Sequence, residues 1–293
     1  MSTTDDLSEK LTVFCSERAG HPVSVEHLTR LSGGASRATW SFNAVDPDGE
    51  RHLVLRQDPP GAPARADRSM DLEVEVLTRA HRAGVPVPRV LWAGNADELG
   101  SPGFVMEHVA GETIARRILR EDEYRKAREV MADQCGEILA RIHTISPDGL
   151  GLAAPDGKPT ETVLEQYRGL LDSFGEPHPA FELAMRWLER RMPSSERTTV
   201  VHGDFRNGNF IVGTEGVRAV LDWELVHIGD PWEDLAWVCT RSWRFGGAGE
   251  VGGFGDRADL YAAYERTSGI AVDRDAVRWW ETMSNVKWGV MTI

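Results

Sequence analysis

Three side chains with metal-binding or acid–base chemistry lie at the ends of short apolar runs. Asp204 stands three residues beyond the run TVV (199–201), within the stretch VVHGDFRNGNFIVG. Asn209 follows five residues later, directly before the run FIV, and Asp222 directly follows the run AVL. Each of the three therefore marks the end of a strand-like segment, so their side chains could converge at one end of a strand–loop–strand unit.

These residue types suit phosphoryl transfer. Mg²⁺ takes oxygen ligands, typically one or two from protein while phosphates and water supply the rest, and Asn209 with Asp222 fits that requirement. Asp204 would then remain to orient a substrate hydroxyl and accept its proton. Arg206 could contact Asp204 or the substrate, and the role of a solvated arginine is equally open. Each residue alone is also an ordinary turn residue, so the hypothesis depends on the combination.

Neighbouring polar residues are expected to support this loop. His202 is expected to brace it through hydrogen bonds, and His143 falls on the apolar side of a helical pattern. Asp230 precedes Pro231, which is typical of a helix N-cap followed by proline at the first helical position. We therefore expect Asp230 and Asp234 to be mainly structural.

The first hundred residues read as an antiparallel sheet. Strand-like runs alternate with turn signals from residue 25 to 58. Apolar residues then recur at helical spacing in MDLEVEVLTRAHRAG (70–84), and the strand-like runs RVLWAG and GFVMEHV follow. We expect a sheet of about five strands that carries one helix.

The remainder of the chain is mainly helical in pattern. Residues 113–145 form the clearest helical stretch, and strand-like runs interrupt the helices only around 199–223. A length of 293 residues is enough for two lobes that share a cleft. The last run is helical and stops at Ile293 without a breaker, so we expect a truncated form of something longer.

Composition narrows the classes of partner. The formal net charge of −13 opposes binding to nucleic acid or to anionic membranes, and a phosphorylated ligand would require local cations. The start MSTTDDLSEK lacks the features of a signal peptide. The three cysteines lie far apart, which favours free thiols in a reducing cytoplasm. We therefore expect a cytoplasmic protein with a small-molecule partner.

The polar loop carries a resemblance to a known family. HGDFRNGN is similar to the H-G-D-x-x-x-x-N catalytic loop of the aminoglycoside phosphotransferase-like, or kinase-like, family. LDWELVHIGDPWEDLAW resembles that family's metal-binding segment, and the branch fused to acyl-CoA dehydrogenase domains is the most similar. The resemblance implies an α+β, bilobal, protein-kinase-like fold, with a nucleotide-binding lobe at 1–107 and a catalytic and substrate lobe at 108–293. It also implies that Asp204 is the catalytic base and that Asn209 and Asp222 are Mg²⁺ ligands.

The resemblance extends to nucleotide-binding residues in the first lobe. It implies that Arg56 replaces the usual phosphate-binding lysine, that Glu73 pairs with Arg56, and that Val54 faces adenine. Arg56 is a departure from the family pattern, because arginine and lysine differ in shape, and an exposed strand arginine is the alternative. The resemblance further implies a nucleotide loop within LSGGAS (31–36), at Ser32, Gly33 and Gly34, and a hinge within MEHV, at Met106, Glu107 and His108.

Together these features predict an ATP-dependent kinase that uses Mg²⁺ to phosphorylate a hydroxyl group of a small molecule. The branch suggests a hydroxyacyl-CoA or a hydroxy acid as the acceptor. Two alternatives stay open: an aminoglycoside or other antibiotic phosphotransferase, which an acidic chain would suit, and a nucleotide-binding pseudokinase that acts as a scaffold.

Overall fold

The chain folds into two compact units in a computed structural model that describes residues 3–31, 37–59, 69–194 and 197–293. The first unit comprises residues 1–81 and 87–109, and the second comprises residues 82–86 and 110–293. Within the described ranges, no helix is both long and apolar enough to cross a membrane.

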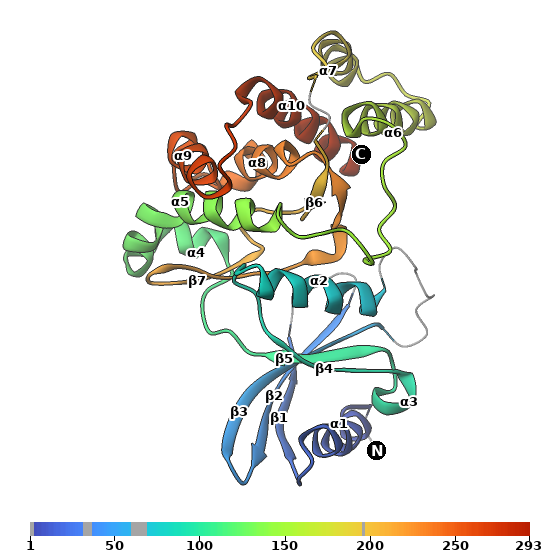
Figure 1. Cartoon of the computed structure of the whole chain (residues 1–293), viewed down its shortest axis with the longest axis vertical. Helices are drawn as coiled ribbons and strands as arrows, with labels where there is room; N and C mark the ends of the chain where they lie inside the picture. The colour runs from blue at the N-terminus through green and yellow to red at the C-terminus, as the bar shows by residue number, and fades with distance from the viewer. Residues whose placement is uncertain (1–2, 32–36, 60–68, 195–196) are drawn as a thin grey trace. The chain divides into compact units, whose positions relative to one another are not determined.

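The first unit is built on a five-stranded antiparallel sheet, as the alternating strand and turn signals predicted (Figure 1). Its strands follow the order β1-β2-β3-β5-β4, so only β5 and β4 depart from chain order. The β2–β3 hairpin keeps an unbroken register from Ala38 opposite Gln57 to Asp46 opposite Gly49. The strands are β1 (Ser24–Arg30), β2 (Ala38–Asp46), β3 (Gly49–Gln57), β4 (Val90–Gly94) and β5 (Gly103–Glu107).

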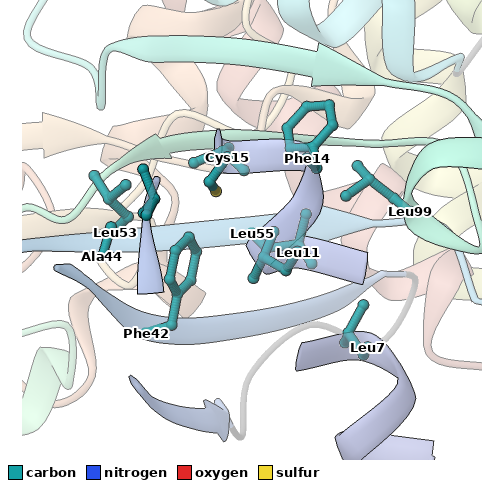
Figure 2. Packing of buried hydrophobic residues seen from close by; sticks show 11 residues of the cluster. Leu7, Leu11, Phe14, Cys15, Phe42, Ala44, Leu53, Leu55 and Leu99 are labelled. Atoms are coloured by element: carbon teal, nitrogen blue, oxygen red, sulfur yellow. The ribbon is translucent and has the colours of Figure 1, made fainter. Parts of the chain in front are cut away.

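The expectation of a single helix in this unit was wrong. The described part contains α1 (Thr3–Ala19), α2 (Met70–Arg82) and the short α3 (Ala96–Leu99). The polar start of the chain hides α1, because the apolar residues of this helix lie among many charged ones. Those apolar side chains pack against the sheet and α3 in one buried cluster (Figure 2). The cluster includes Leu7, Leu11, Phe14, Cys15, Phe42, Ala44, Leu53, Leu55 and Leu99.

The second unit is mainly helical, as predicted. The expected continuous helix at 113–145 is instead interrupted near Glu121, whose backbone is extended. Arg128 Nη1 donates to the carbonyls of Ile118 and Glu121, so its side chain links the segments on the two sides of the interruption. The helices are α4 (Ala115–Arg120), η2 (Asp122–Tyr124), α5 (Arg125–Ile142), α6 (Pro159–Ser173), α7 (Pro179–Arg190), η3 (Trp223–Leu225), α8 (Trp232–Cys239), η4 (Arg241–Arg244), α9 (Arg257–Ser268) and α10 (Arg274–Met291).

The helical unit also contains two small pairs of antiparallel strands. The strand β7 (Phe210–Gly213) pairs with β8 (Gly216–Val220), and β6 (Thr199–Val201) pairs with β9 (His227–Gly229). The sequence patterns predicted the runs that form β6, β7 and β8 but not β9, which is only three residues long. Because β6 precedes the polar loop and β7 follows it, these two pairs hold both ends of that loop.

The packing of α1 generates a stability prediction. Leu11 is fully buried in the cluster, whereas Val13 on the same helix is 58% exposed. Leu11→Ala should destabilise the protein by about 2–5 kcal/mol, because it removes buried methyl groups and leaves a cavity. Val13→Ala, the matched control, should change stability by no more than about 0.5 kcal/mol. Urea unfolding followed by circular dichroism would measure both, and equal effects would contradict the packing of α1.

Candidate active site

The β7–β8 hairpin brings Asn209 and Asp222 to one place. Asn209 directly precedes β7, and Asp222 lies two residues beyond the end of β8. The backbone N–H of Leu221 donates to the carbonyl of Asn209 at 2.8 Å, so the strand pairing continues past Phe210 and Val220. The two predicted metal ligands therefore lie at the same, open end of the hairpin. Asp222 adopts the left-handed backbone conformation, which non-glycine residues rarely use away from functional sites.

The carboxylate of Asp204 is held by three side chains. Arg206 Nε lies 3.0 and 3.1 Å from its two oxygens, and Trp237 Nε1 donates to Oδ1 at 2.7 Å. Asn209 Nδ2 donates to Oδ2 at 2.6 Å. Donors on both oxygens fix the plane of the carboxylate, while 14% of the side chain stays exposed. A base that must meet an incoming hydroxyl needs this combination of fixed orientation and access.

The hydrogen bonds of Asn209 are consistent with a metal-binding role. Its Nδ2 donates to the Asp204 carbonyl as well as to the Asp204 carboxylate. These bonds occupy the nitrogen end of the amide, so Oδ1 is the atom that a metal ion would contact. With the carboxylate of Asp222, the pair offers the hard oxygen donors that Mg²⁺ requires.

A buried carboxylate anchors the backbone of the loop. Asp234 on α8 accepts hydrogen bonds from the N–H groups of His202 at 2.8 Å and Gly203 at 3.0 Å. His143 Nε2 lies 3.3 Å from the same carboxylate, and His143 Nδ1 lies 3.0 Å from the Tyr264 hydroxyl. The side chain of Asp234 is fully buried. It has the structural role that we expected, because it fixes the position of the loop backbone. Asp230 Oδ1 accepts from the N–H of Trp232, the first residue of α8, but the N-cap position is Pro231, so the expected start of this helix was one residue early.

His202 braces the loop as a neutral ring. Burial lowers the pKa of His202, although nearby carboxylates oppose that effect. Its Nδ1 accepts from the N–H of Asp204, so the proton resides on Nε2, which donates to the Leu221 carbonyl. Gly203 beside it has φ +80°, and a Cβ there would lie 2.4 Å from the Leu225 carbonyl oxygen. Only glycine fits that position.

An aromatic and cationic wall lies beside Asp204, and the sequence reasoning missed it. The guanidinium of Arg206 stacks 4.4 Å from the centre of the Trp243 ring, and Lys287 Nζ lies 4.8 Å from the ring centre of Trp237. Trp237 is the residue that donates to Asp204. The position of Trp237 within GDPWEDLAW could have indicated that it lies near the loop. Lys287 comes from α10, and no local pattern in the sequence relates it to the loop.

Lys287 belongs to an ion cluster in which Glu233 is buried and His227 is partly exposed. Glu233 accepts from Lys287 Nζ at 3.2 Å, and His227 Nε2 lies 3.2 Å from the other oxygen of Glu233. Burial alone would raise the pKa of Glu233, but Lys287 and His227 outweigh it and lower the pKa to about 2. Burial alone would likewise lower the pKa of His227, but Glu233 raises it to about 9. At neutral pH the cluster therefore carries two cations and one anion.

In the first unit, Arg56 and Glu73 form the ion pair that the sequence predicted. Arg56 Nε lies 2.9 Å from Glu73 Oε1, and both side chains are largely buried. Arg37, which sequence reasoning missed, also contacts Glu73. The position of Arg37 directly after the LSGGAS stretch could have indicated a role near the predicted nucleotide loop. Ser32, Gly33 and Gly34 lie outside the described residues.

The expected adenine hinge is restricted by its own hydrogen bonds. Val54 pairs with Met106 across β3 and β5, and both side chains are buried. The N–H of Glu107 donates to the Arg89 carbonyl, and the N–H of His108 donates to the His52 carbonyl. The N–H groups of Glu107 and His108 are therefore already used, and hydrogen bonds from this segment to adenine are expected only from its carbonyl oxygens and from the N–H of Val109.

The ion cluster generates a pH prediction. Because the folded pKa of His227 lies above its ordinary value of 6.5, its interaction with Glu233 stabilises the protein below about pH 6.5 and is lost as the pH rises through about 9. His227→Gln should therefore lower the urea midpoint more at about pH 6.5 than at about pH 9.5. The exposed His81 provides the control, since His81→Gln should show no such difference. Equal loss from His227→Gln at both pH values would contradict the ion pair.

Similarity to known proteins agrees with this geometry. Acyl-CoA dehydrogenase family member 10 of Mus musculus is 32% identical over 228 residues, which cover 75% of this chain and 21% of that protein. Family member 11 of Rattus norvegicus is 31% identical, with 71% and 27% covered. The chain thus spans only about a quarter of these relatives. The aminoglycoside 3′-phosphotransferase of Streptomyces fradiae is 26% identical, with 60% and 66% covered.

Solved structures share the protein-kinase-like fold. A putative aminoglycoside phosphotransferase from Ralstonia eutropha has a TM-score of 0.76 at 23% identity, covering 97% of this chain and 86% of its own. Aminoglycoside phosphotransferase APH(4)-Ia, in a complex with ADP and hygromycin B, has a TM-score of 0.65 at 18% identity, with 97% and 91% covered. The phosphotransferase enzyme family matches residues 27–280. The chain therefore belongs to the phosphotransferase enzyme family.

Proposed function

We propose that the protein transfers the γ-phosphoryl group of ATP to a hydroxyl group of a small molecule. The observation that carries this proposal is the carboxylate of Asp204, which Arg206, Trp237 and Asn209 hold in one orientation beside the open end of the β7–β8 hairpin. These donors hold the carboxylate in one orientation while 14% of the side chain stays exposed to an incoming hydroxyl.

ATP is the proposed phosphoryl donor. The structural neighbour APH(4)-Ia is described with ADP and with AMP-PNP, which supports an adenine nucleotide here. Arg56 in the first unit would supply a cation for the phosphates, and Val54 with the Met106–His108 segment would supply the adenine site. The overall charge of −13 makes such a local cation necessary.

Mg²⁺ is the proposed metal, with Asn209 and Asp222 as its protein ligands. When bound, it would neutralise charge on the phosphate oxygens and hold them for in-line attack. The Asn209 amide is oriented for this role by its bonds to Asp204, so a single side chain links the metal site to the base.

In the proposed reaction, Asp204 orients the acceptor hydroxyl through a hydrogen bond. The hydroxyl oxygen forms a bond to the γ-phosphorus as the bond from phosphorus to the bridging oxygen of ADP breaks. The hydroxyl proton passes to the Asp204 carboxylate as the new phosphate ester forms. Arg206 lies within hydrogen-bonding distance of Asp204 and stacks on Trp243, so it would keep the carboxylate in place during transfer.

For the acceptor we propose a hydroxy acid or a hydroxyacyl-CoA. Arg206 and Lys287 lie in the wall beside Asp204 and would meet an acidic group of the acceptor. The carboxylates in contact with them are Asp204 and Glu233. The similarity to acyl-CoA dehydrogenase family members supports an acceptor of this acidic class over a polycationic aminoglycoside.

We further propose that the protein acts in the cytoplasm without nucleic acid or membrane partners. The net charge of −13 opposes both partners, and all three cysteines are buried free thiols. A nucleotide-binding scaffold without turnover is the alternative function. The replacement of the usual lysine by Arg56 favours that alternative, whereas the fully formed Asp204 site opposes it.

The assignment of Asp204 is tested by Asp204→Ala. Turnover should fall by about 10²-fold or more, because the acceptor hydroxyl loses its orienting base, while the affinity for ATP stays within about threefold. Asp172→Asn, at an exposed position on α6, is the control and should leave turnover unchanged. Unchanged turnover in Asp204→Ala would contradict the proposed function.

The acceptor is tested by ADP release with Mg²⁺ and three panels: hydroxy acids, hydroxyacyl-CoAs and aminoglycosides. Stimulation by either acidic class is expected. Stimulation by aminoglycosides alone would overturn the proposed acceptor while keeping the phosphotransferase reaction. ATP binding without stimulation by any panel would favour the scaffold.

A further inference from the structure

Lys287 lies on the ring of the tryptophan that donates to Asp204. Its Nζ is 4.8 Å from the ring centre of Trp237, and Trp237 Nε1 donates to Asp204 Oδ1 at 2.7 Å. Trp237 is only 2% exposed, and its ring also contacts that of Trp243, with 5.3 Å between the ring centres. A cation, a second aromatic ring and a hydrogen bond therefore hold the indole in place.

Glu233 keeps the Lys287 ammonium over that ring. Glu233 and Trp237 are four residues apart on α8, so their side chains lie on the same face of the helix. Glu233 Oε1 accepts from Lys287 Nζ at 3.2 Å, and the side chain of Lys287 is 15% exposed. Burial alone would lower the pKa of Lys287, but Glu233 outweighs it and raises the pKa above its ordinary value. Lys287 is therefore a cation at neutral pH.

We propose that Lys287 is a positioning residue for Asp204, which acts through the indole N–H of Trp237. This inference rests on the proposed function, because it takes Asp204 as the base. It goes beyond the direct donors of the carboxylate, since Lys287 comes from a distant helix, α10, and works through a second residue.

The argument follows from the charge distribution of the indole. A cation over the face of the ring attracts the π electrons and draws electron density away from Nε1. The N–H then becomes a stronger donor, because neighbouring charges and hydrogen bonds polarise one another where water is excluded. Trp237 holds Oδ1 of Asp204, while Asn209 holds Oδ2. A weaker donor at Trp237 would let the carboxylate rotate away from the orientation that meets the acceptor hydroxyl.

Three other roles for Lys287 would have different consequences. A residue that only stabilises the fold would change the urea midpoint and leave kcat of the folded protein unchanged. A charge that acts on Asp204 directly through space would change kcat equally with or without the Trp237 N–H. Contact with an acidic group of the acceptor would change KM for the acceptor rather than kcat.

The test measures ADP release by the whole chain with Mg²⁺, ATP and the panel member that stimulates the wild type most. Lys287→Met removes the charge and keeps the apolar stem. It should lower kcat about five- to tenfold and leave KM for ATP within about twofold. Lys287→Arg keeps a cation for the ring, so its kcat should stay within about threefold of the wild type.

A double-mutant cycle tests whether the effect passes through Trp237. Trp237→Phe keeps a ring but removes the N–H, and it should lower kcat about tenfold. In that background Lys287→Met should lower kcat by less than about a further twofold, because the donor that it strengthens is already gone. The matched control is Trp279, a buried tryptophan whose Nε1 donates to the Leu188 carbonyl. Trp279→Phe loses a comparable hydrogen bond and should keep the kcat of the wild type.

A second variant covers the loss of the ion pair. Lys287→Met leaves Glu233 with His227 as its described partner, and such a change can impair folding. The double variant Lys287→Met/Glu233→Gln removes both charges, and it should show the same loss of kcat as Lys287→Met. Recovery of kcat in this double variant would mean that the exposed charge of Glu233, rather than the missing cation on the ring, caused the loss.

Indole ¹⁵N–¹H spectra give a readout that does not depend on turnover. The signal of Trp237 is identified by its absence in Trp237→Phe. In Lys287→Met this proton should exchange with water about threefold or more faster than in the wild type, because its hydrogen bond to Asp204 is weaker. The Trp279 signal should exchange at an unchanged rate.

Four outcomes would overturn the inference: a kcat of folded Lys287→Met equal to that of the wild type, a full effect of Lys287→Met in the Trp237→Phe background, recovery of kcat in Lys287→Met/Glu233→Gln, or unchanged exchange of the Trp237 proton. All four leave the proposed function standing, because the wild type still transfers phosphate. A wild-type protein that releases no ADP with any panel member would overturn the inference and the proposed function together.

Discussion

The buried carboxylate of Asp234 is the constraint on which the candidate active site depends. It accepts the backbone N–H groups of His202 and Gly203, and it receives a third contact from His143 in the core. A carboxylate without these partners would be costly at a fully buried position. The stability of Asp234 in the core therefore depends on the loop, and the position of the loop depends on Asp234. Gly203 makes the close approach possible, because a side chain there would meet the Leu225 carbonyl. The loop is therefore held by its backbone, which leaves the Asp204 side chain available for chemistry.

Hydrogen bonds also link the loop to the two candidate metal ligands. The β7–β8 pairing places Asn209 and Asp222 at one end of a hairpin, and the amide of Asn209 holds Asp204. Hydrogen bonds join these positions into one unit rather than leaving them as independent groups. Trp237 joins α8 to that unit, so the helix that carries Asp234 also contributes a direct donor to Asp204.

Positively charged side chains gather at two places in this protein, although its net charge is negative. The chain is strongly acidic, yet Arg206 and Lys287 lie on the aromatic rings beside Asp204, and two arginines contact Glu73 in the first unit. Each of these cations is held by a carboxylate or stacks on an aromatic ring, which limits the cost of burying it. Cations fixed in this way suit phosphorylated ligands, which an acidic surface alone would repel.

The sequence by itself determined the sheet-then-helices order, and it indicated Asp204, Asn209 and Asp222 as candidates for phosphoryl transfer, because strand periodicity and residue spacing are local properties of the chain. It also predicted the Arg56–Glu73 pair through the order of motifs. It did not reveal α1, whose apolar face becomes apparent only against the sheet, or the short β9, which exists as a partner of β6. Only the tertiary structure brought Lys287 to Trp237 and Arg37 to Glu73. Those contacts join elements far apart in the chain, and no periodicity or spacing within a single element encodes which distant side chain will fill the space beside it.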